Sequence, residues 1–295
     1  MGYNFSVVQE IEAKTALNKL NSKYLPYHWD LNIYRGCSHH CVYCYALYSH
    51  QYLQTNNFYQ DIFVKTNIAQ VLEKQLSSPR WRHQVVNLGG VTDNYQPLES
   101  QYQLMPQVLK LFTKYRTPIT ISTKSDLILR DQDLIYQLAA VAPVNIAVTI
   151  TTFNESLRQL IEPGAVSSLR RLSVLKNFKH PNISLGLHFM PMLPLITDTP
   201  QNVEEVFSQV SSAQPNYIIT GFLNLRSATK INFLKFLQQN FPSLYSQYHQ
   251  IYRGAFVNRD YAHQAYQSIS ALRQKYHLNP YHPPLEATPS QLSLI

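Results

Sequence analysis

Two kinds of apolar pattern alternate along this chain. Short continuous apolar runs predict buried strands, at residues 29–33, 85–88, 118–122, 144–150, 184–190 and 217–223. Apolar residues at helical spacing predict helices near residues 67–76, 102–115, 131–141, 167–177, 202–211 and 229–239. Strand and helix segments that take turns in this way are typical of parallel βαβ units. The pattern therefore predicts an α/β fold built on a parallel sheet.

The two ends of the chain depart from this alternation. Residues 7–21 carry apolar positions that we interpret as a short helix, and residues 261–276 predict a closing helix. Beyond residue 279 the composition is Pro-rich and typical of a poorly ordered tail. We therefore predict three parts, which are an N-terminal helical extension, a core barrel and a C-terminal helical extension with a Pro-rich tail. Their expected bounds are residues 1–23, 24–240 and 241–295.

Polar and glycine residues follow three of the predicted strands directly. Residues 89–93 follow one strand, residues 122–124 end the next, and residues 149–152 end a third. The carboxyl ends of parallel strands meet at one edge, where α/β barrels carry their active sites. On a later strand, His188 and Met190 alternate with their apolar neighbours, so we expect both to face the barrel interior. The sequence thus predicts a single site at that edge.

All three cysteines of the chain, Cys37, Cys41 and Cys44, fall within eight residues in a C-x3-C-x2-C run. Thiolates this close together repel one another unless a soft metal binds them, and soft sulfur ligands select zinc, copper(I) or an iron–sulfur cluster. A zinc site would recruit His39 or His40 as its fourth ligand. Closely spaced cysteines on one loop favour a single iron–sulfur cluster, and three unligated thiols are the remaining alternative.

The stretch 32–46, Asn-Ile-Tyr-Arg-Gly-Cys-Ser-His-His-Cys-Val-Tyr-Cys-Tyr-Ala, resembles the cluster loop of radical S-adenosylmethionine (radical SAM) enzymes. It is most similar to the branch related to spore photoproduct lyase. Further segments match that branch in order and spacing, namely residues 48–53, 92–99, 122–125, 129–131, 150–152 and 162–165. The resemblance covers roughly residues 10 to 240, and an ordered set of motifs is more specific than one cysteine pattern.

The resemblance implies a partial (β/α)6 TIM-like barrel and a radical SAM enzyme. Three thiolates would hold three irons of a 4Fe–4S cluster, and the amine and carboxylate of S-adenosylmethionine would chelate the fourth. Reductive cleavage of S-adenosylmethionine would then give a 5′-deoxyadenosyl radical that abstracts hydrogen from a substrate. A low-potential flavodoxin or ferredoxin would supply the electron.

The resemblance also assigns residues to S-adenosylmethionine. Gly89 and Gly90 let backbone approach the methionyl ammonium, and Asp93 offers a counter-charge. Lys124 has the methionyl carboxylate as its partner, because an unpaired lysine in a barrel mouth is costly. An ion pair of Glu162 with Arg170 or Arg171 is a further candidate. The expected cofactor-binding set is Tyr43, Gly89, Gly90, Thr92, Asp93, Ser122, Lys124, Thr149 and Thr151.

Composition and charge bear on the partners and the cellular location of the protein. The net charge of +8 favours anionic partners and leaves nucleic acid as a candidate. No apolar run reaches the roughly 18 residues of a membrane span, and the first residues lack the regions of a signal peptide. With every cysteine in one loop and none spare for a disulfide, we expect a cytoplasmic protein.

One departure from the spore photoproduct lyase pattern bears on function. That enzyme returns a hydrogen atom from a cysteine outside the cluster motif, and this chain has no fourth cysteine. DNA photoproduct or lesion cleavage is therefore an alternative, with a tyrosine such as Tyr95 as hydrogen donor. A zinc-dependent nucleic-acid-binding protein without catalysis is the alternative of another class. The expected enzyme is a radical SAM enzyme whose substrate stays open.

Overall fold

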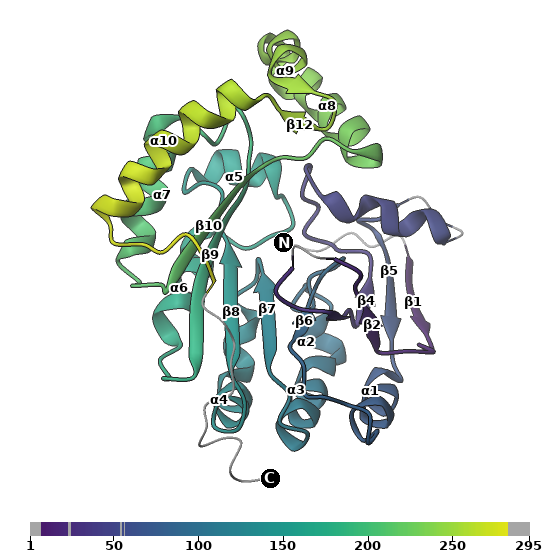
Figure 1. Ribbon diagram of the computed structural model, residues 1–295. Helices are drawn as coiled ribbons and strands as arrows, with labels where there is room; N and C mark the ends of the chain where they lie inside the picture. The colour runs from purple at the N-terminus through teal and green to yellow at the C-terminus, as the bar shows by residue number, and fades with distance from the viewer. Residues whose placement is uncertain (1–6, 23–24, 54, 56, 283–295) are drawn as a thin grey trace.

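The computed structural model describes residues 7–22, 25–53, 55 and 57–282 (Figure 1). A seven-stranded sheet has the order β10-β9-β8-β7-β6-β3-β2, in which β3 and β6 to β10 run parallel and β2 pairs antiparallel at the edge. The strands are β2 (Leu17–Lys19), β3 (Trp29–Leu31), β6 (Val86–Leu88), β7 (Ile119–Thr123), β8 (Val144–Thr149), β9 (Ile183–Met192) and β10 (Tyr217–Phe222). All six predicted strands are confirmed.

Six longer helices alternate with these strands, as predicted. They are α1 (Ile68–Leu76), α3 (Leu104–Lys114), α4 (Gln132–Ala139), α6 (Ser168–Asn177), α7 (Pro200–Ser211) and α8 (Ser227–Asn240). The parallel strands follow chain order across the sheet, and the sheet curves as in Figure 1, which makes a partial barrel. The α/β class and the barrel prediction are both confirmed.

The core explains why these segments adopt these elements. Every residue of β8 is buried, because neighbouring strands flank it on both sides and helices α4 and α6 pack against it. Four of its six residues, Val144, Ile146, Val148 and Thr149, are β-branched, which is typical of a buried parallel strand. In α3, buried residues recur at helical spacing along one face, including Met105, Val108 and Phe112.

The predicted N-terminal helix is wrong. Residues Val7–Ile11 form strand β1, which pairs in parallel with β5 (Asp61–Lys65), and β5 pairs antiparallel with β4 (Tyr34–Arg35). Valine and isoleucine favour strands, and β1 gains ladder hydrogen bonds from an edge that local apolar spacing does not reveal. The following strand β2 extends the main sheet. Sequence reasoning missed β4 and β5 altogether.

Several shorter elements connect the longer ones and were not predicted. They are η1 (Tyr45–Tyr52), α2 (Glu99–Tyr102), η2 (Leu127–Asp131), α5 (Glu155–Ile161), η3 (Pro242–Leu244), α9 (Tyr245–Ile251), β11 (Tyr252–Arg253) and β12 (Phe256–Val257).

The predicted closing helix is present as α10 (Arg259–Lys275), which packs against α7 and carries an ion pair between Lys275 and Glu204 at 2.6 Å. Residues 283–295 of the predicted tail lie outside the described residues, and the bounds of the three predicted parts stay predictions. In the described part of the chain, no helix combines the length and apolar character needed to cross a membrane.

Candidate functional site

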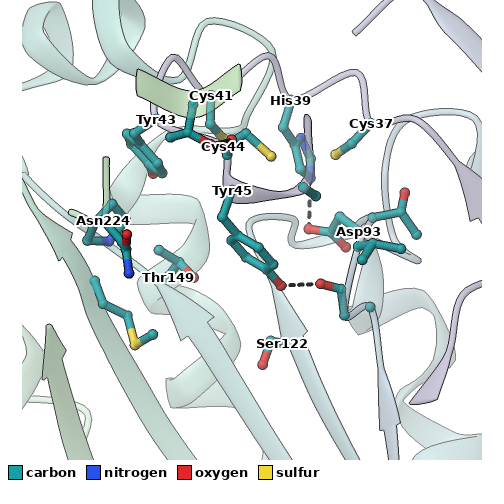
Figure 2. Close-up of a pocket in the computed structure, with 18 of the residues that line it drawn as sticks. Cys37, His39, Cys41, Tyr43, Cys44, Tyr45, Asp93, Ser122, Thr149 and Asn224 are labelled. Atoms are coloured by element: carbon teal, nitrogen blue, oxygen red, sulfur yellow. Dashed lines mark hydrogen bonds and ion pairs between the residues drawn. The ribbon is translucent and has the colours of Figure 1, made fainter. Parts of the chain in front are cut away.

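A cavity of about 700 Å³ lies at the carboxyl ends of the parallel strands (Figure 2). The predicted site residues converge there, with one exception. Those that line it are Cys37, Cys41, Tyr43, Cys44, Gly89, Gly90, Thr92, Asp93, Ser122, Lys124 and Thr149. The exception is Thr151, whose hydroxyl instead donates to the Glu162 carboxylate at 3.3 Å. The cavity also contains both residues expected to face the interior, His188 and Met190.

The three thiols sit on the loop between β4 and η1 and are free cysteines. Burial raises the pKa of Cys41 to about 12 and raises the pKa of Cys37 and Cys44 as well. Each thiol therefore stays protonated near neutral pH unless a metal stabilises its thiolate. Within the described ranges, no three His, Cys, Asp or Glu side chains converge on a single-ion site. A cluster does not need that convergence, since each thiolate binds a different iron.

Backbone contacts from distant segments hold this loop in place. The Val42 amide donates to the Ile161 carbonyl at 3.0 Å, and the Gly164 amide donates to the His39 carbonyl at 3.0 Å. A Cβ at position 164 would lie 1.9 Å from the Ser38 carbonyl oxygen, so only glycine permits this approach. The motif at 162–165 thus docks the cysteine loop onto the barrel.

Asp93 joins the cysteine loop to the end of β7. Its carboxylate lies 2.8 Å from His39 Nε2 and accepts from the Thr123 hydroxyl at 2.9 Å and from the Lys124 amide at 2.7 Å. Burial alone would raise the pKa of Asp93, but the charge and hydrogen bond of His39 and the backbone donors outweigh it and lower that pKa. The carboxylate is therefore ionised and already occupied by protein donors.

Polar residues on both sides of Asp93 also hold the cysteine loop in place. The Thr92 hydroxyl donates to the Gly36 carbonyl at 2.5 Å, and Gln96 Nε2 donates to that carbonyl at 3.2 Å. The Ser38 amide in turn donates to Gln96 Oε1 at 3.1 Å. These bonds explain why the motif at 92–99 accompanies the cysteine motif in the sequence.

The buried Glu99 and the partly exposed Arg130 form a second support for that motif. The Glu99 carboxylate accepts from the Tyr34 hydroxyl at 2.6 Å and pairs with Arg130 at 2.8 Å, and Arg130 also pairs with Asp131 at 2.7 Å. Tyr95 is fully buried near this group and does not line the cavity. The structure therefore does not place Tyr95 where a hydrogen donor to a cavity ligand would stand.

On the opposite side of the cysteines lies a buried ion pair between Glu162 and Arg171, with their closest atoms 2.5 Å apart and both side chains fully buried. The Tyr43 hydroxyl donates to the same carboxylate. Of the two partners considered for Glu162, Arg171 is thus confirmed. Arg170 instead pairs with Asp126 at 2.6 Å on the surface.

Lys124 reaches into the cavity next to this pair, with its Nζ 5.7 Å from the centre of the Tyr43 ring. Burial opposes its charge, but the attraction of Cys41 in its thiolate form and of the Glu162 carboxylate outweighs burial and raises the pKa of Lys124. Burial likewise opposes the charge of Glu162, but Arg171 and Lys124 lower its pKa. The cavity thus holds a protonated lysine beside a carboxylate that is already paired.

Sequence reasoning missed Tyr45, which directly follows the last cysteine. Figure 2 shows its ring inside the cavity, with the hydroxyl donating to the Gly90 carbonyl. Gly90 in turn packs against the Asp30 carboxylate, which accepts from Asn87 at 2.7 Å. Adjacency to Cys44 was the one available signal for Tyr45. Nothing in the local sequence pointed to Asn224 or Arg226, which also line the cavity.

Known proteins resemble this chain both in sequence and in fold. The model of the Radical SAM superfamily matches residues 31–208. An uncharacterised protein of Mycobacterium tuberculosis is 34% identical over 280 residues, which cover 93% of this chain and 82% of that protein. An uncharacterised protein of Methanocaldococcus jannaschii is 28% identical over 239 residues, covering 80% and 84%.

Two solved structures share the fold. Spore photoproduct lyase complexed with dinucleoside spore photoproduct has a TM-score of 0.69 at 13% identity, covering 93% of this chain and 82% of that one. A mutant of the same enzyme, with bound AdoMet and dinucleoside spore photoproduct, has a TM-score of 0.68 at 13% identity, with 94% and 82% covered. At this level of identity the likeness establishes the fold alone.

Proposed function

Because the chain belongs to the radical SAM superfamily, whose enzymes use a 4Fe–4S cluster and S-adenosylmethionine, we propose that Cys37, Cys41 and Cys44 hold the cluster in this cavity. The observation that carries this proposal is the convergence of all three thiols and Lys124 on one cavity. Three soft sulfur donors suit iron, and their raised pKa values suit ligands whose thiolate form depends on a metal.

When bound, the cluster supplies the electron that cleaves S-adenosylmethionine to methionine and a 5′-deoxyadenosyl radical, which abstracts hydrogen from the substrate. The protein residues bind, orient and shield the reactants. Lys124 binds the methionyl carboxylate, since its ammonium lines the cavity close enough to Cys41 to interact with it electrostatically. The Gly89 and Gly90 backbone faces the methionyl ammonium, and Ser122 and Thr149 offer hydroxyls to the ribose and carboxylate.

The remaining predicted residues have supporting roles in this proposal. Tyr43 packs near the adenine, and its hydroxyl is held by a hydrogen bond to the Glu162 carboxylate. The Thr151 hydroxyl donates to the same carboxylate. Asp93 adds negative charge near the ammonium while its carboxylate anchors His39, and Thr92 anchors the cysteine loop. A low-potential flavodoxin or ferredoxin delivers the electron, and a reducing cytoplasm keeps the thiols available for iron.

The proposal is tested under strict anaerobiosis. Wild-type protein and the Cys41→Ala variant are reconstituted with iron and sulfide, reduced with dithionite and given S-adenosylmethionine, and 5′-deoxyadenosine is measured by chromatography. We expect product from the wild type and only background from the variant. A colourless wild-type protein that retains one zinc per chain and makes no product would overturn the proposal in favour of a zinc-binding protein.

A nucleic-acid lesion is the second candidate substrate. Two observations favour it, namely the net charge of +8 and the position of Arg226 on the cavity wall, where its guanidinium lies 4.8 Å from the exposed Phe256 ring. Binding to ultraviolet-irradiated and intact duplex DNA is compared across salt concentrations. Preference for irradiated DNA, with a steep loss of affinity in salt, supports this candidate. Equal, weak binding to both duplexes rejects it.

A further inference from the structure

His188 lies on β9 inside the barrel, in register with Thr149 of β8 and Ile219 of β10. Its side chain lines the cavity, together with Met190 of the same strand. Among the residues that the structure describes, no hydrogen bond or ion pair reaches its imidazole, and its ring contact is with Tyr217 at 6.4 Å between centroids. A polar ring that faces a cavity without a protein partner is available to a ligand.

A buried polar platform lies beside this imidazole. The Tyr217 ring crosses the barrel interior over Gly186, where a Cβ would lie 2.0 Å from the tyrosine Cζ. The Tyr217 hydroxyl donates to Asn145 at 3.0 Å, and the Asn145 amide donates to the Thr120 hydroxyl at 2.9 Å. Barrel interiors are usually filled by branched apolar side chains. This polar floor is therefore a specific arrangement, in which Tyr217, Asn145 and Thr120 are joined by hydrogen bonds while the His188 imidazole beside them has none within the described residues.

The imidazole is uncharged at neutral pH. Burial and the positive charges of Lys124 and His282 lower the pKa of His188 to about 4. A neutral imidazole offers one N–H donor and one nitrogen acceptor. It therefore matches a ligand group that presents a donor and an acceptor and carries no charge.

The cavity as a whole is poorly suited to a cationic substrate group. Asp93 is the one carboxylate in the described lining, and His39, Thr123 and Lys124 already occupy it. Glu162, just behind the lining, is paired with Arg171. A substrate ammonium, entering in addition to that of S-adenosylmethionine, would meet Lys124 without a further counter-charge.

We propose that His188 binds an uncharged amide-like or imide-like group of the substrate, with the apolar part of the substrate against Met190 and Phe222. Both residues line the same wall as His188. This assignment rests on the proposed function, because it names the substrate side of the same cavity. It makes His188 a specificity-determining residue, in addition to the three thiols and Lys124 that are proposed to bind the cluster and S-adenosylmethionine.

The test uses two matched small probes on cluster-reconstituted protein saturated with S-adenosylmethionine. The lactam 2-pyrrolidone offers one N–H and one carbonyl without charge, and pyrrolidine is its cationic counterpart of the same ring size. Saturation-transfer NMR titrations compare wild type with His188→Phe and with His188→Gln, which keeps one donor and one acceptor. His263→Phe, on the exposed face of α10, is the matched control.

We expect the wild type to bind the lactam and not pyrrolidine. Affinity for the lactam falls roughly threefold to tenfold in His188→Phe, the range of one or two lost hydrogen bonds. Binding is retained in His188→Gln and in the control. If His188→Phe does not fold, the comparison of the lactam with pyrrolidine and the His188→Gln variant still test the role of His188.

Three results overturn the inference. In the first, the lactam does not bind, or it binds equally well to wild type and His188→Phe. In the second, pyrrolidine binds and its binding depends on His188. In the third, saturating S-adenosylmethionine abolishes lactam binding. The last would assign His188 to the cofactor. Wild-type protein that makes no 5′-deoxyadenosine fails the proposed function instead, so the two failures are distinguishable.

Discussion

The two walls of the cavity differ in how their polar groups are used. On the cysteine side, Asp93, Glu162 and Arg171 are buried and paired with protein partners. On the β9–β10 side, His188 faces the cavity without a hydrogen bond, and Met190 is 40% exposed. Both walls belong to one barrel; the first holds ion pairs and hydrogen bonds within the protein, whereas the second presents an imidazole that makes neither within the described residues.

The difference indicates a division of work. Chemistry that depends on position is assembled where rigid networks fix each side chain in advance. Recognition of a substrate needs groups that are still free to bind, and an unpartnered polar group is retained only where a ligand or water satisfies it. We therefore assign the paired wall to the cluster and S-adenosylmethionine, and the open wall to the substrate.

The largest loss of unfolding free energy is expected when the buried ion pair of the cysteine side is removed. Arg171→Met leaves the Glu162 carboxylate buried and unpaired, which costs about 3–5 kcal/mol of unfolding free energy. The neighbouring Arg170→Met removes an exposed pair and costs at most about 1 kcal/mol. Chemical unfolding of both variants checks this. Equal losses would show that the buried pair is not what holds the wall.

A smaller loss follows from cutting the link between the cysteine loop and β7. Asp93→Asn removes the charge from hydrogen bonds to His39, Thr123 and the Lys124 amide and costs about 1.5–3 kcal/mol. The amount of iron bound per chain after reconstitution also falls, because the cysteine loop loses the ion pair of His39 with Asp93 that links it to the end of β7. Asp133→Asn, an exposed change on α4, is the control for both measurements. Full stability and full iron content in Asp93→Asn would contradict the anchoring role.

Removing the cavity lysine should affect the cofactor more than the fold. Lys124→Met removes the proposed partner of the methionyl carboxylate, so affinity for S-adenosylmethionine falls roughly tenfold to a hundredfold. Equilibrium dialysis of the reconstituted protein measures it. Lys114→Met, which removes a surface pair with Glu73, leaves the affinity unchanged. A Lys124 variant that binds as tightly as the wild type would remove this residue from the site.

The smallest effect on stability is expected at the open wall. Met190 lines the cavity and is 40% exposed, so Met190→Ala changes unfolding free energy by less than about 1 kcal/mol. Met105→Ala, at a fully buried position of α3, costs about 2–5 kcal/mol. Thermal unfolding compares the two. A large loss at Met190 would mean that this wall is ordinary core and not a free surface.

Sequence alone predicted the parts of this molecule that repeat a strong local pattern. The six parallel strands and their helices follow from apolar runs and helical spacing, and the thiols follow from the clustering of all cysteines in one loop. The N-terminal strand β1 did not, because its partner β5 lies 54 residues away in register at Val7 and Asp61. Pairing partners at that separation leave no local signal.

The sequence predicted which residues belong to the site better than it predicted how they are arranged. The resemblance named Asp93, Lys124 and Thr151, but only the folded structure turns Thr151 toward Glu162 and commits Asp93 to His39. The free imidazole of His188 could not be read from the sequence either. Whether an inward histidine is satisfied depends on residues of β8 and β10 that meet it only in the barrel.

The most direct test of the account is Mössbauer spectroscopy of protein reconstituted anaerobically with 57Fe, before and after S-adenosylmethionine is added. The account predicts about four irons per chain in one 4Fe–4S cluster, with one iron distinct from the other three and altered by S-adenosylmethionine. That result would show a cluster with three irons held alike and one open to S-adenosylmethionine, as three thiolate ligands require. Four equivalent irons that S-adenosylmethionine leaves unchanged, or a chain that binds zinc in place of iron, would contradict it.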